Sequence, residues 1–288
     1  MKIDVLGTAF MDVVFRKPET GFQLDNVVFS KNARISAGGN GCNLAINLAK
    51  LGVRTSFYGQ IGKDYPGQVI TRDFLKNGVI STQTNKNDTG ISLVIVNDVG
   101  QRAVTSFQGL NNTFELESQY ISNLKNDTAI CGLGLLPHVE NQMDLIIKKI
   151  HSIGKTIYAG TTGDTQVLYS FINNKMYENL DFLFMNEVEA KRLCKLKSTI
   201  DCGKYLTNTC KIRNVVITEG ENGATLISKY DVYHVDALKV NCLDSTGAGD
   251  AFMAGFIKEY SQSHNSVKAL SFANLEGSRN VQFFGATK

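Results

Sequence analysis

The sequence contains no tryptophan and only three prolines among 288 residues. A planar ligand therefore has no indole ring to stack on, and few segments are stiffened by a proline ring. Glycine is abundant instead, with 26 residues against a typical share of about 7%. This combination predicts many tight backbone turns rather than disordered linkers.

The chain has no large excess of charge of one sign: its 30 Lys and Arg residues nearly balance its 27 Asp and Glu residues. No basic run is longer than a pair, so the charge pattern of a nucleic-acid-binding protein is missing. No apolar stretch approaches the roughly 18 residues of a membrane span, and Asp4 interrupts the apolar start of any signal peptide. We therefore expect a cytoplasmic protein with neither nucleic acid nor membrane as a partner.

Several catalytic and binding motifs are also missing. The cysteines form no C-x-x-C pair and fit no common zinc spacing, so we expect reduced, mostly buried thiols. Neither the P-loop pattern nor the protein-kinase motifs occur. A nucleotide-dependent oxidoreductase would need G-x-G-x-x-G after the first strand, where the chain has Gly7-Thr8-Ala9-Phe10.

Short apolar strands and amphipathic helices alternate along most of the chain. This alternation predicts an α/β fold with a mostly parallel sheet between two helical layers, in a single domain over residues 1–288. The expected strands include 3–6, 55–59, 128–131, 156–159, 182–185 and 215–218, with a hairpin at 224–228 and 232–235. The expected helices include 41–51, 69–75, 143–150, 187–194, 251–260 and 266–281.

Two segments do not follow this alternation. Residues 91–96 and 102–107 flank Asn97-Asp98-Val99-Gly100, which is a hairpin signal. Residues 12–36 are less periodic, with short strands expected at 27–29 and 34–35. We interpret the segments at about 12–36 and 88–109 as a small antiparallel β flap, or lid, attached to the main body.

The strongest chemical motif is the run DSTGAGDAFMAG from Asp244 to Gly255. Small residues at Gly247, Ala248 and Gly249 let the backbone approach a ligand, and a helix begins directly after them. Free N–H groups at a helix start form an anion site that suits phosphate. An aspartate at position 250 would lie beside that phosphate and can accept a proton from an attacking hydroxyl. The alternative is that Asp250 only decorates the first helical turn, and spacing alone does not decide between the two.

A second glycine turn precedes the first helix. Gly38 and Gly39 admit a ligand against the backbone, and the Asn43 amide offers both a donor and an acceptor to hydroxyl groups. An ordinary glycine turn before a helix would look the same. Asn186 and Glu189 lie on the same face at the start of another helix. They can be ligand-binding residues or a simple helix-capping arrangement.

These motifs, in this order, resemble the ribokinase-like (PfkB) family of carbohydrate kinases. The run 244–255 resembles the family's C-terminal signature, and Ala37 to Gly52 its N-terminal one. The resemblance implies a three-layer α/β/α sandwich of the ribokinase type. It also implies that Asp250 is the catalytic base and that Gly247, Ala248 and Gly249 form the anion hole.

The same resemblance assigns the remaining site residues. Asp12 would bind two sugar hydroxyls, together with Gly38, Gly39 and Asn43. Asn186 and Glu189 would act on phosphate and Mg²⁺, largely through water. Some relatives bind a monovalent cation such as K⁺ near the residues that match Asp244 and Thr246. The ATP-binding residues implied are Thr218, Gly220, Gly223 and Asn274.

The chain departs from the family pattern at two places. Glu219 stands where relatives often have a lysine, which leaves the nucleotide contacts open. Many relatives carry an acidic residue and a D-x-N-x-R run where this chain has Cys131-Gly132-Leu133-Gly134 and residues 158–164. Asp164 is a candidate to replace part of that run.

The sequence therefore predicts an ATP-dependent kinase that phosphorylates the primary hydroxyl of a ribose- or fructose-like sugar. A nucleoside kinase of the pseudouridine type is the alternative within the family, and a non-catalytic sugar-binding regulator is a third hypothesis. Relatives often dimerise through the flap, so a homodimer of this kind is also an expectation.

Overall fold

The computed structural model describes residues 1–16, 27, 29–30, 32–81, 84, 86–97, 102–116, 121–122, 124–162, 178 and 180–287. Within these residues a nine-stranded sheet has the order β13-β12-β11-β10-β9-β8-β1-β4-β5. Its strands are β1 (Lys2–Gly7), β4 (Arg54–Tyr58), β5 (Ile80–Ser81), β8 (Asp127–Leu133), β9 (Ile157–Thr161), β10 (Phe182–Asn186), β11 (Asn214–Thr218), β12 (Ala224–Ser228) and β13 (Val232–Val235). Its pairs are parallel except β11–β12 and β12–β13.

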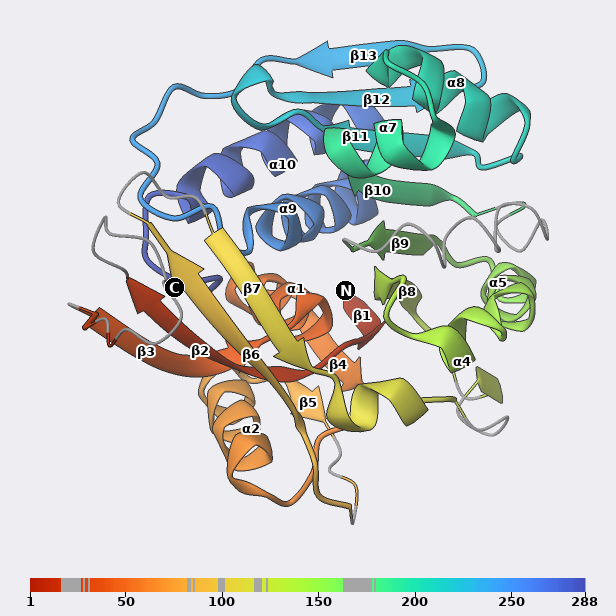
Figure 1. Ribbon diagram of the computed structural model, residues 1–288. Helices are drawn as coiled ribbons and strands as arrows, with labels where there is room; N and C mark the ends of the chain where they lie inside the picture. Colours follow the sequence, from red (N-terminus) through yellow and green to blue (C-terminus); the bar gives the residue numbers. More distant parts are fainter. Residues whose placement is uncertain are drawn as a thin grey trace.

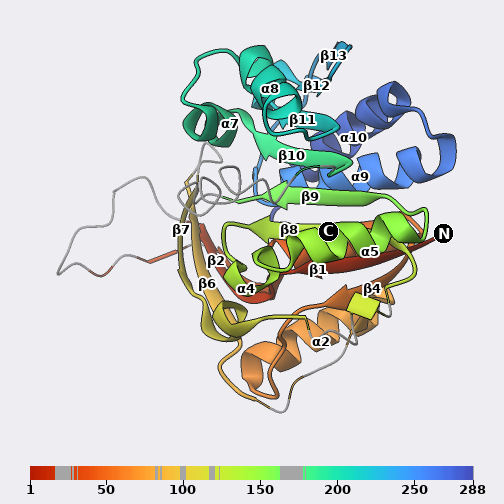
Figure 2. The same cartoon turned by 90° about the vertical axis from the view of Figure 1, so that its right-hand side faces the viewer.

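Helices cover both faces of this sheet, as Figures 1 and 2 show. They are α1 (Asn40–Lys50), α2 (Tyr65–Asn77), α4 (Pro137–Glu140), α5 (Met143–Ser152), α7 (Glu187–Cys194), α8 (Thr199–Asn208), α9 (Ala248–Ser263) and α10 (Ser266–Asn280), with short 3₁₀ turns at Gly109–Thr113 and Gly220–Asn222. Successive strand residues point to opposite faces, so each strand contributes to two cores. In β10, for example, Phe182 and Phe184 pack with α1, α9 and α10, whereas Leu183 and Met185 pack with α5, α7 and α8. The expected three-layer α/β/α sandwich is confirmed.

A second, four-stranded sheet lies beside the large one, at the end of β1 away from the N-terminus (Figure 2). Its order is β3-β2-β6-β7, with β2 (Phe10–Arg16), β3 (Asn32–Gly38), β6 (Gly90–Val96) and β7 (Arg102–Phe107). The predicted flap is therefore present, and β6 and β7 form the expected antiparallel pair.

The prediction that the flap is antiparallel throughout is wrong. The central strands β2 and β6 are parallel, with Phe10 opposite Gly90 and Arg16 opposite Val96. The physical reason is the connection between them: β3, α1, β4, α2 and β5 intervene. Only strands joined by a short turn are forced to be antiparallel, whereas a long crossover permits parallel pairing.

Most predicted elements are confirmed, and one short strand is not. Gly52 and Gly78 follow helices α1 and α2 with positive φ angles of 79° and 72°, as expected for glycines that end helices. Val27 and Phe29 lie outside strands and are 82% and 83% exposed, so the predicted strand at 27–29 is wrong. Apolar side chains alone do not make a strand, because a strand also needs a hydrogen-bonded neighbour. Residues 98–100 of the expected turn lie outside the described residues.

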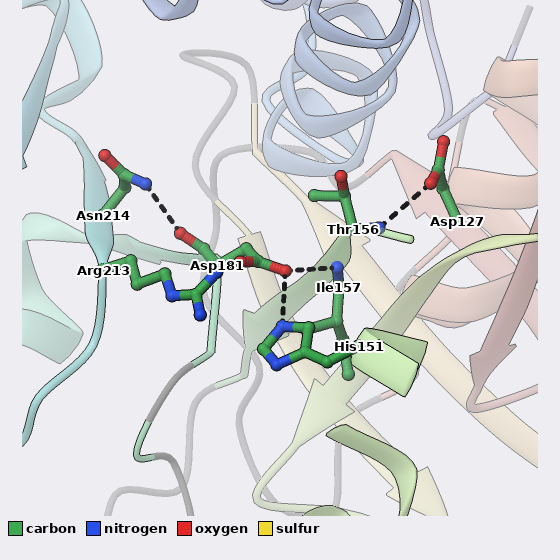
Figure 3. Close-up of polar contacts among 7 residues, drawn as sticks. All are labelled: Asp127, His151, Thr156, Ile157, Asp181, Arg213 and Asn214. Carbon is green, nitrogen blue, oxygen red and sulfur yellow. Dashed lines mark hydrogen bonds and ion pairs between the residues drawn. The ribbon is translucent and has the colours of Figure 1, made fainter. Parts of the chain in front are cut away.

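Hydrogen bonds of Asp181 connect the starts of β9, β10 and β11 at the amino-terminal edge of the large sheet (Figure 3). Asp181 Oδ2 accepts a bond from Ile157 N at 2.9 Å and lies 3.0 Å from His151 Nε2. Its Oδ1 accepts from Arg213 Nη1 at 2.7 Å, and its carbonyl oxygen accepts from Asn214 Nδ2 at 2.9 Å. These bonds fix the starts of β9, β10 and β11, and therefore the positions at which the same strands end.

Among the described residues, no helix is both long and apolar enough to cross a membrane. Four of the six cysteines (Cys42, Cys131, Cys202 and Cys210) are buried.

Candidate active site

A cleft of about 620 Å³ lies where the large sheet meets the small one. Its floor includes the carboxyl ends of β8, β9, β10 and β11, and side chains of β2, β6 and β7 line it from the small sheet. Its volume falls within the usual range for small-molecule sites. In open α/β sheets, ligands bind outside the carboxyl ends of the strands, so this cleft is the candidate active site.

Two helices begin at this cleft, α1 and α9. Each is preceded by a glycine with a positive φ angle, 85° at Gly39 and 74° at Gly247. Neither N-cap residue provides a side-chain hydrogen bond to the first turn. The first-turn N–H groups and the positive ends of two helix dipoles therefore face one region, which favours a bound anion.

Asp250 lies between these two helix starts and is only 8% exposed. Its Oδ1 accepts a hydrogen bond from Asn40 Nδ2 at 3.0 Å, and its Oδ2 accepts one from Asn43 Nδ2 at 2.9 Å. The other amide atom of Asn43, Oδ1, is buried without a partner. Asp250 thus does more than decorate a helix: it is a buried carboxylate in the cleft, held by two amide groups from another helix.

The turn before α9 is held by the segment at residues 284–287. A Cβ atom on Gly247 would lie 2.6 Å from Ala286 O, so only glycine fits there. The fully buried Asp244 accepts from Thr246 N and Gly285 N, each at 2.8 Å. Ala248 N donates to Ser245 O at 3.3 Å. Around Gly249, in contrast, a Cβ atom would meet nothing within 4 Å, so the cleft is open at this residue.

The far end of the cleft lies against the small sheet. Asp12 on β2 is 6% exposed and lines the cleft, together with Gly39 and Asn43. Gly38 does not line it, but packs directly under the Asp12 carboxylate. Ser92 and Ser106, whose hydroxyl oxygens lie 2.8 Å apart, complete this end of the cleft.

Asn186 and Glu189 both line the cleft and form a capping box at the start of α7. Glu189 N donates to Asn186 Oδ1 at 2.8 Å, and Asn186 N donates to Glu189 Oε2 at 3.1 Å. Thr161 Oγ1 donates to the same Glu189 oxygen at 2.7 Å. The capping alternative weighed from the sequence is therefore real, and it presents a carboxylate at the cleft.

The residues expected to bind the nucleotide are less closely grouped. Thr218 lines the cleft, whereas Gly220, Gly223 and Asn274 lie outside its lining. Gly220 and Gly223 have positive φ angles of 60° and 102° in the turn after β11, and Asn274 Nδ2 donates to the Asp236 carbonyl at 2.7 Å.

Glu219, the departure from the family pattern, is turned away from the cleft. Thr225 Oγ1 donates to its Oε2 at 2.7 Å, and His234 Nδ1 lies 3.4 Å from that oxygen. Asp164 lies outside the described residues.

The charge of the cleft lining is one-sided. In the part of the chain that the structure describes, the lining contains three carboxylates, Asp12, Glu189 and Asp250, and no Lys, Arg or His. Cys131 also lines the cleft, but burial, and secondarily the Asp250 charge, raise the pKa of its thiol. The thiol is therefore not a nucleophile near neutral pH. The carboxylate of Asp250 is the better candidate for chemistry.

Sequence reasoning missed several residues of this site. Asn40 was not considered, although its spacing of three residues from Asn43 places both amides on one face of α1. Ser92 and Val94 are two residues apart on β6 and therefore lie on the same face of the strand. This shared face could have been predicted from the sequence. Arg34 on β3 donates to the carbonyls of Phe284 at 2.7 Å and Thr287 at 3.0 Å, and no local pattern predicts a contact across 250 residues.

Comparison with known proteins agrees with this geometry. The profile of the pfkB family carbohydrate kinase matches residues 1–288. A ribokinase of Staphylococcus aureus (strain COL) is 28% identical over 295 residues, covering 99% of this chain and 95% of that protein.

Two solved structures share the fold over nearly the whole chain. An adenosine kinase from Sinorhizobium meliloti has a TM-score of 0.85 and 19% identity, covering 100% of this chain and 95% of that one. The ribokinase of Arabidopsis thaliana, solved with ribose and ATP, has a TM-score of 0.80 and 22% identity, covering 99% and 93%. The chain belongs to the pfkB family of carbohydrate kinases and is an ATP-dependent kinase.

Proposed function

We propose that the chain transfers the γ-phosphate of ATP to the primary hydroxyl of a sugar, with Asp250 as the catalytic base. The observation that carries this proposal is the position of Asp250, between the starts of α1 and α9 and bonded on both oxygens to amide groups of α1. A carboxylate beside an anion site is the arrangement that deprotonation of an attacking hydroxyl requires.

In this mechanism the acceptor hydroxyl donates its proton to Asp250 as its oxygen attacks the γ-phosphorus. The bond from the γ-phosphorus to the bridging oxygen of ADP breaks, and ADP leaves. Backbone N–H groups of Gly247, Ala248 and Gly249 stabilise the charge on the phosphoryl oxygens. Ala248 N would exchange its long bond to Ser245 O for a bond to phosphate.

Asp12 and Asn43 would bind the acceptor. A carboxylate has two acceptor atoms and suits a pair of neighbouring hydroxyls, and the unpartnered Asn43 Oδ1 is free to accept another. Gly39 lines the same end of the cleft, and Gly38 leaves room for Asp12. A nucleoside is the second candidate acceptor, because Phe10, Val94, Val104 and Leu135 also line the cleft and can pack against an apolar base.

No Lys, Arg or His lines the cleft in the part of the chain that the structure describes, and we propose that bound cations assist the backbone donors in holding ATP. Asn186 and Glu189 would hold Mg²⁺ through water, and a metal ion there supplies charge neutralisation for the phosphates. Thr218, Gly220, Gly223 and Asn274 would hold the nucleotide. The buried Asp244 has no ion pair among the described residues, and Thr246 Oγ1 is buried without a partner. These two residues fit a monovalent cation such as K⁺.

The same proposal extends to the domain organisation, the lid and the oligomeric state of the protein. The chain would be a single catalytic domain over residues 1–288 in which the small sheet is a lid over the acceptor. Its strand β7 exposes Phe107 (58%), which does not line the cleft and supports a homodimer through the lid. The protein would act in the cytoplasm on small molecules.

Two measurements test the proposal. The first compares ribose, deoxyribose, fructose, adenosine and pseudouridine as acceptors, with ADP release as the readout. The second is Asp250→Asn, which should lower kcat by at least ~10²-fold while ATP still binds. Asp231→Asn, the same substitution at an exposed turn, is the matched control. Near-normal turnover by Asp250→Asn would overturn the assignment of the base.

A further inference from the structure

Asn40 holds one oxygen of the proposed base. It is the first residue of α1 and is half-buried, and its Nδ2 donates to Asp250 Oδ1 at 3.0 Å. Because Asn43 donates to Oδ2, each carboxylate oxygen receives one amide N–H. A carboxylate oxygen can accept more than one hydrogen bond, so these two bonds alone do not prevent Asp250 from accepting a bond from an acceptor hydroxyl.

The two amides come from one rigid element. Asn40 and Asn43 are three residues apart on α1 and therefore lie on the same face of the helix. Asn43 N donates to Gly39 O at 2.9 Å, which closes the first turn around both side chains. Two donors on one helical turn, one at each oxygen, restrict rotation of the carboxylate more than one donor would.

The surroundings make these donors electrostatically important. Two further carboxylates, Asp12 on β2 and Glu189 on α7, share the cleft lining with Asp250. The thiols of Cys42 on α1 and Cys131 on β8 are buried, and the Asp250 charge contributes to raising the pKa of each. No Lys, Arg or His occurs among the described lining residues. The hydrogen bonds from Asn40 and Asn43 favour the ionised form of the Asp250 carboxyl group.

We propose that Asn40 is a positioning residue for the transfer reaction, which orients the Asp250 carboxylate toward the acceptor hydroxyl and keeps it ionised. This inference rests on the proposed function, because it assumes that Asp250 is the base. Asn40 acts through Asp250 and needs no contact with the acceptor or the nucleotide.

The test uses two substitutions of different character. Asn40→Leu removes the donor without adding charge, and Asn40→Asp keeps the shape but replaces the donor with a like charge. A hydrogen bond to a carboxylate lowers its pKa, so its loss should move the acid limb of the kcat/KM profile to higher pH, by about one unit. For Asn40→Asp the shift should be larger, because two carboxylates would then share the site. At neutral pH, kcat should fall by about tenfold in Asn40→Leu.

The control is Asn47→Leu, the same substitution two turns further along α1 and outside the cleft lining. It should leave the pH profile unchanged. Profiles are measured on the full chain with D-ribose, or with the best acceptor of the panel if another sugar or nucleoside is preferred. Thermal unfolding and binding of a non-hydrolysable ATP analogue show that each variant is folded.

The outcomes separate the two proposals. If Asp250→Asn is inactive while both Asn40 variants are folded and keep the wild-type profile, the positioning role is wrong and the base assignment stands. If Asp250→Asn keeps normal turnover, the proposed function fails first. A shifted acid limb in both Asn40 variants, with the larger shift in Asn40→Asp, supports the inference. A loss of stability without a shift of the profile would reduce Asn40 to a structural residue and overturn it.

Discussion

Gly38 on β3 packs directly against the carboxylate of Asp12 on β2. A Cβ atom built on Gly38 would lie 2.0 Å from Asp12 Cγ and 2.2 Å from Oδ1. The two residues lie on adjacent antiparallel strands, with Asp12 opposite Ser36. The glycine of the N-terminal motif is thus required by space rather than by an unusual backbone angle, and what it makes room for is the carboxylate proposed to bind the acceptor.

Gly38→Ala should therefore act on acceptor binding. The added methyl group must displace the Asp12 carboxylate, so KM for the acceptor should rise at least ~10-fold, while KM for ATP changes little. Steady-state kinetics with each substrate varied in turn measure both values. Gly277→Ala in α10 is the control, because its Cβ would be 3.4 Å from the nearest atom and should be tolerated. Equal effects on both KM values would contradict this role of Gly38.

Asp64 should stabilise the fold in a pH-dependent way. It caps α2 through Gly67 N at 3.0 Å and accepts bonds from Thr89 N at 2.8 Å and Thr89 Oγ1 at 2.6 Å. Partial burial alone would raise the pKa of Asp64, but these hydrogen bonds outweigh burial and lower it. Because the pKa is lower in the folded state, the stabilisation is complete above the unfolded value of about 3.9 and is lost as the pH falls.

We expect Asp64→Ala to lower the free energy of unfolding by about 1–2 kcal/mol at pH 7, measured by urea denaturation. The difference from the wild type should narrow when the same measurement is made near pH 3, since the wild-type carboxylate is then being protonated. A difference that stays constant over this range would mean that the charge of Asp64 contributes nothing.

Substitutions of Asn186 and Glu189 should distinguish helix capping from metal binding. Glu189→Gln keeps a side chain that can complete the capping box, so the melting temperature should change little. The concentration of Mg²⁺ needed for half-maximal activity should rise, because a carboxylate is lost from the cleft. Asn186→Ala should instead cost about 1 kcal/mol of stability, with Asn186→Ser as the control that keeps a cap. An unchanged Mg²⁺ dependence in Glu189→Gln would leave the pair a cap and nothing more.

Local patterns were sufficient for much of the fold. Helix α7 runs over the predicted residues, from Glu187 to Cys194, because its capping signal and charged first turn are contained in the segment. The hairpin predicted at 224–228 and 232–235 is also confirmed, because β12 and β13 pair antiparallel across a short connection. Strand β2 was missed because its run FMDVVFR carries no clean alternation: Phe10, Met11 and Asp12 are all buried.

The candidate site was predictable as a set of motifs but not as a set of contacts. The sequence placed Asp250 at a helix start, and the structure adds that its partners are Asn40 and Asn43, more than 200 residues away. The parallel pairing of β2 with β6 also cannot be predicted from a local sequence pattern. Residues 10–16 and 90–96 are far apart in the sequence and pair only after a long crossover connection. Partner choice depends on tertiary packing, which no local pattern reports.

The contacts of residues 284–287 have a consequence for biosynthesis. Ala286 packs on Gly247, Gly285 N bonds to Asp244, and Arg34 reaches across to Phe284 and Thr287. The turn that precedes α9 is therefore completed only after residues 284–287 have left the ribosome. A nascent chain that already includes Asp12, Asn43 and Asp250 therefore still lacks the contacts that hold the turn before α9 until residues 284–287 have been added.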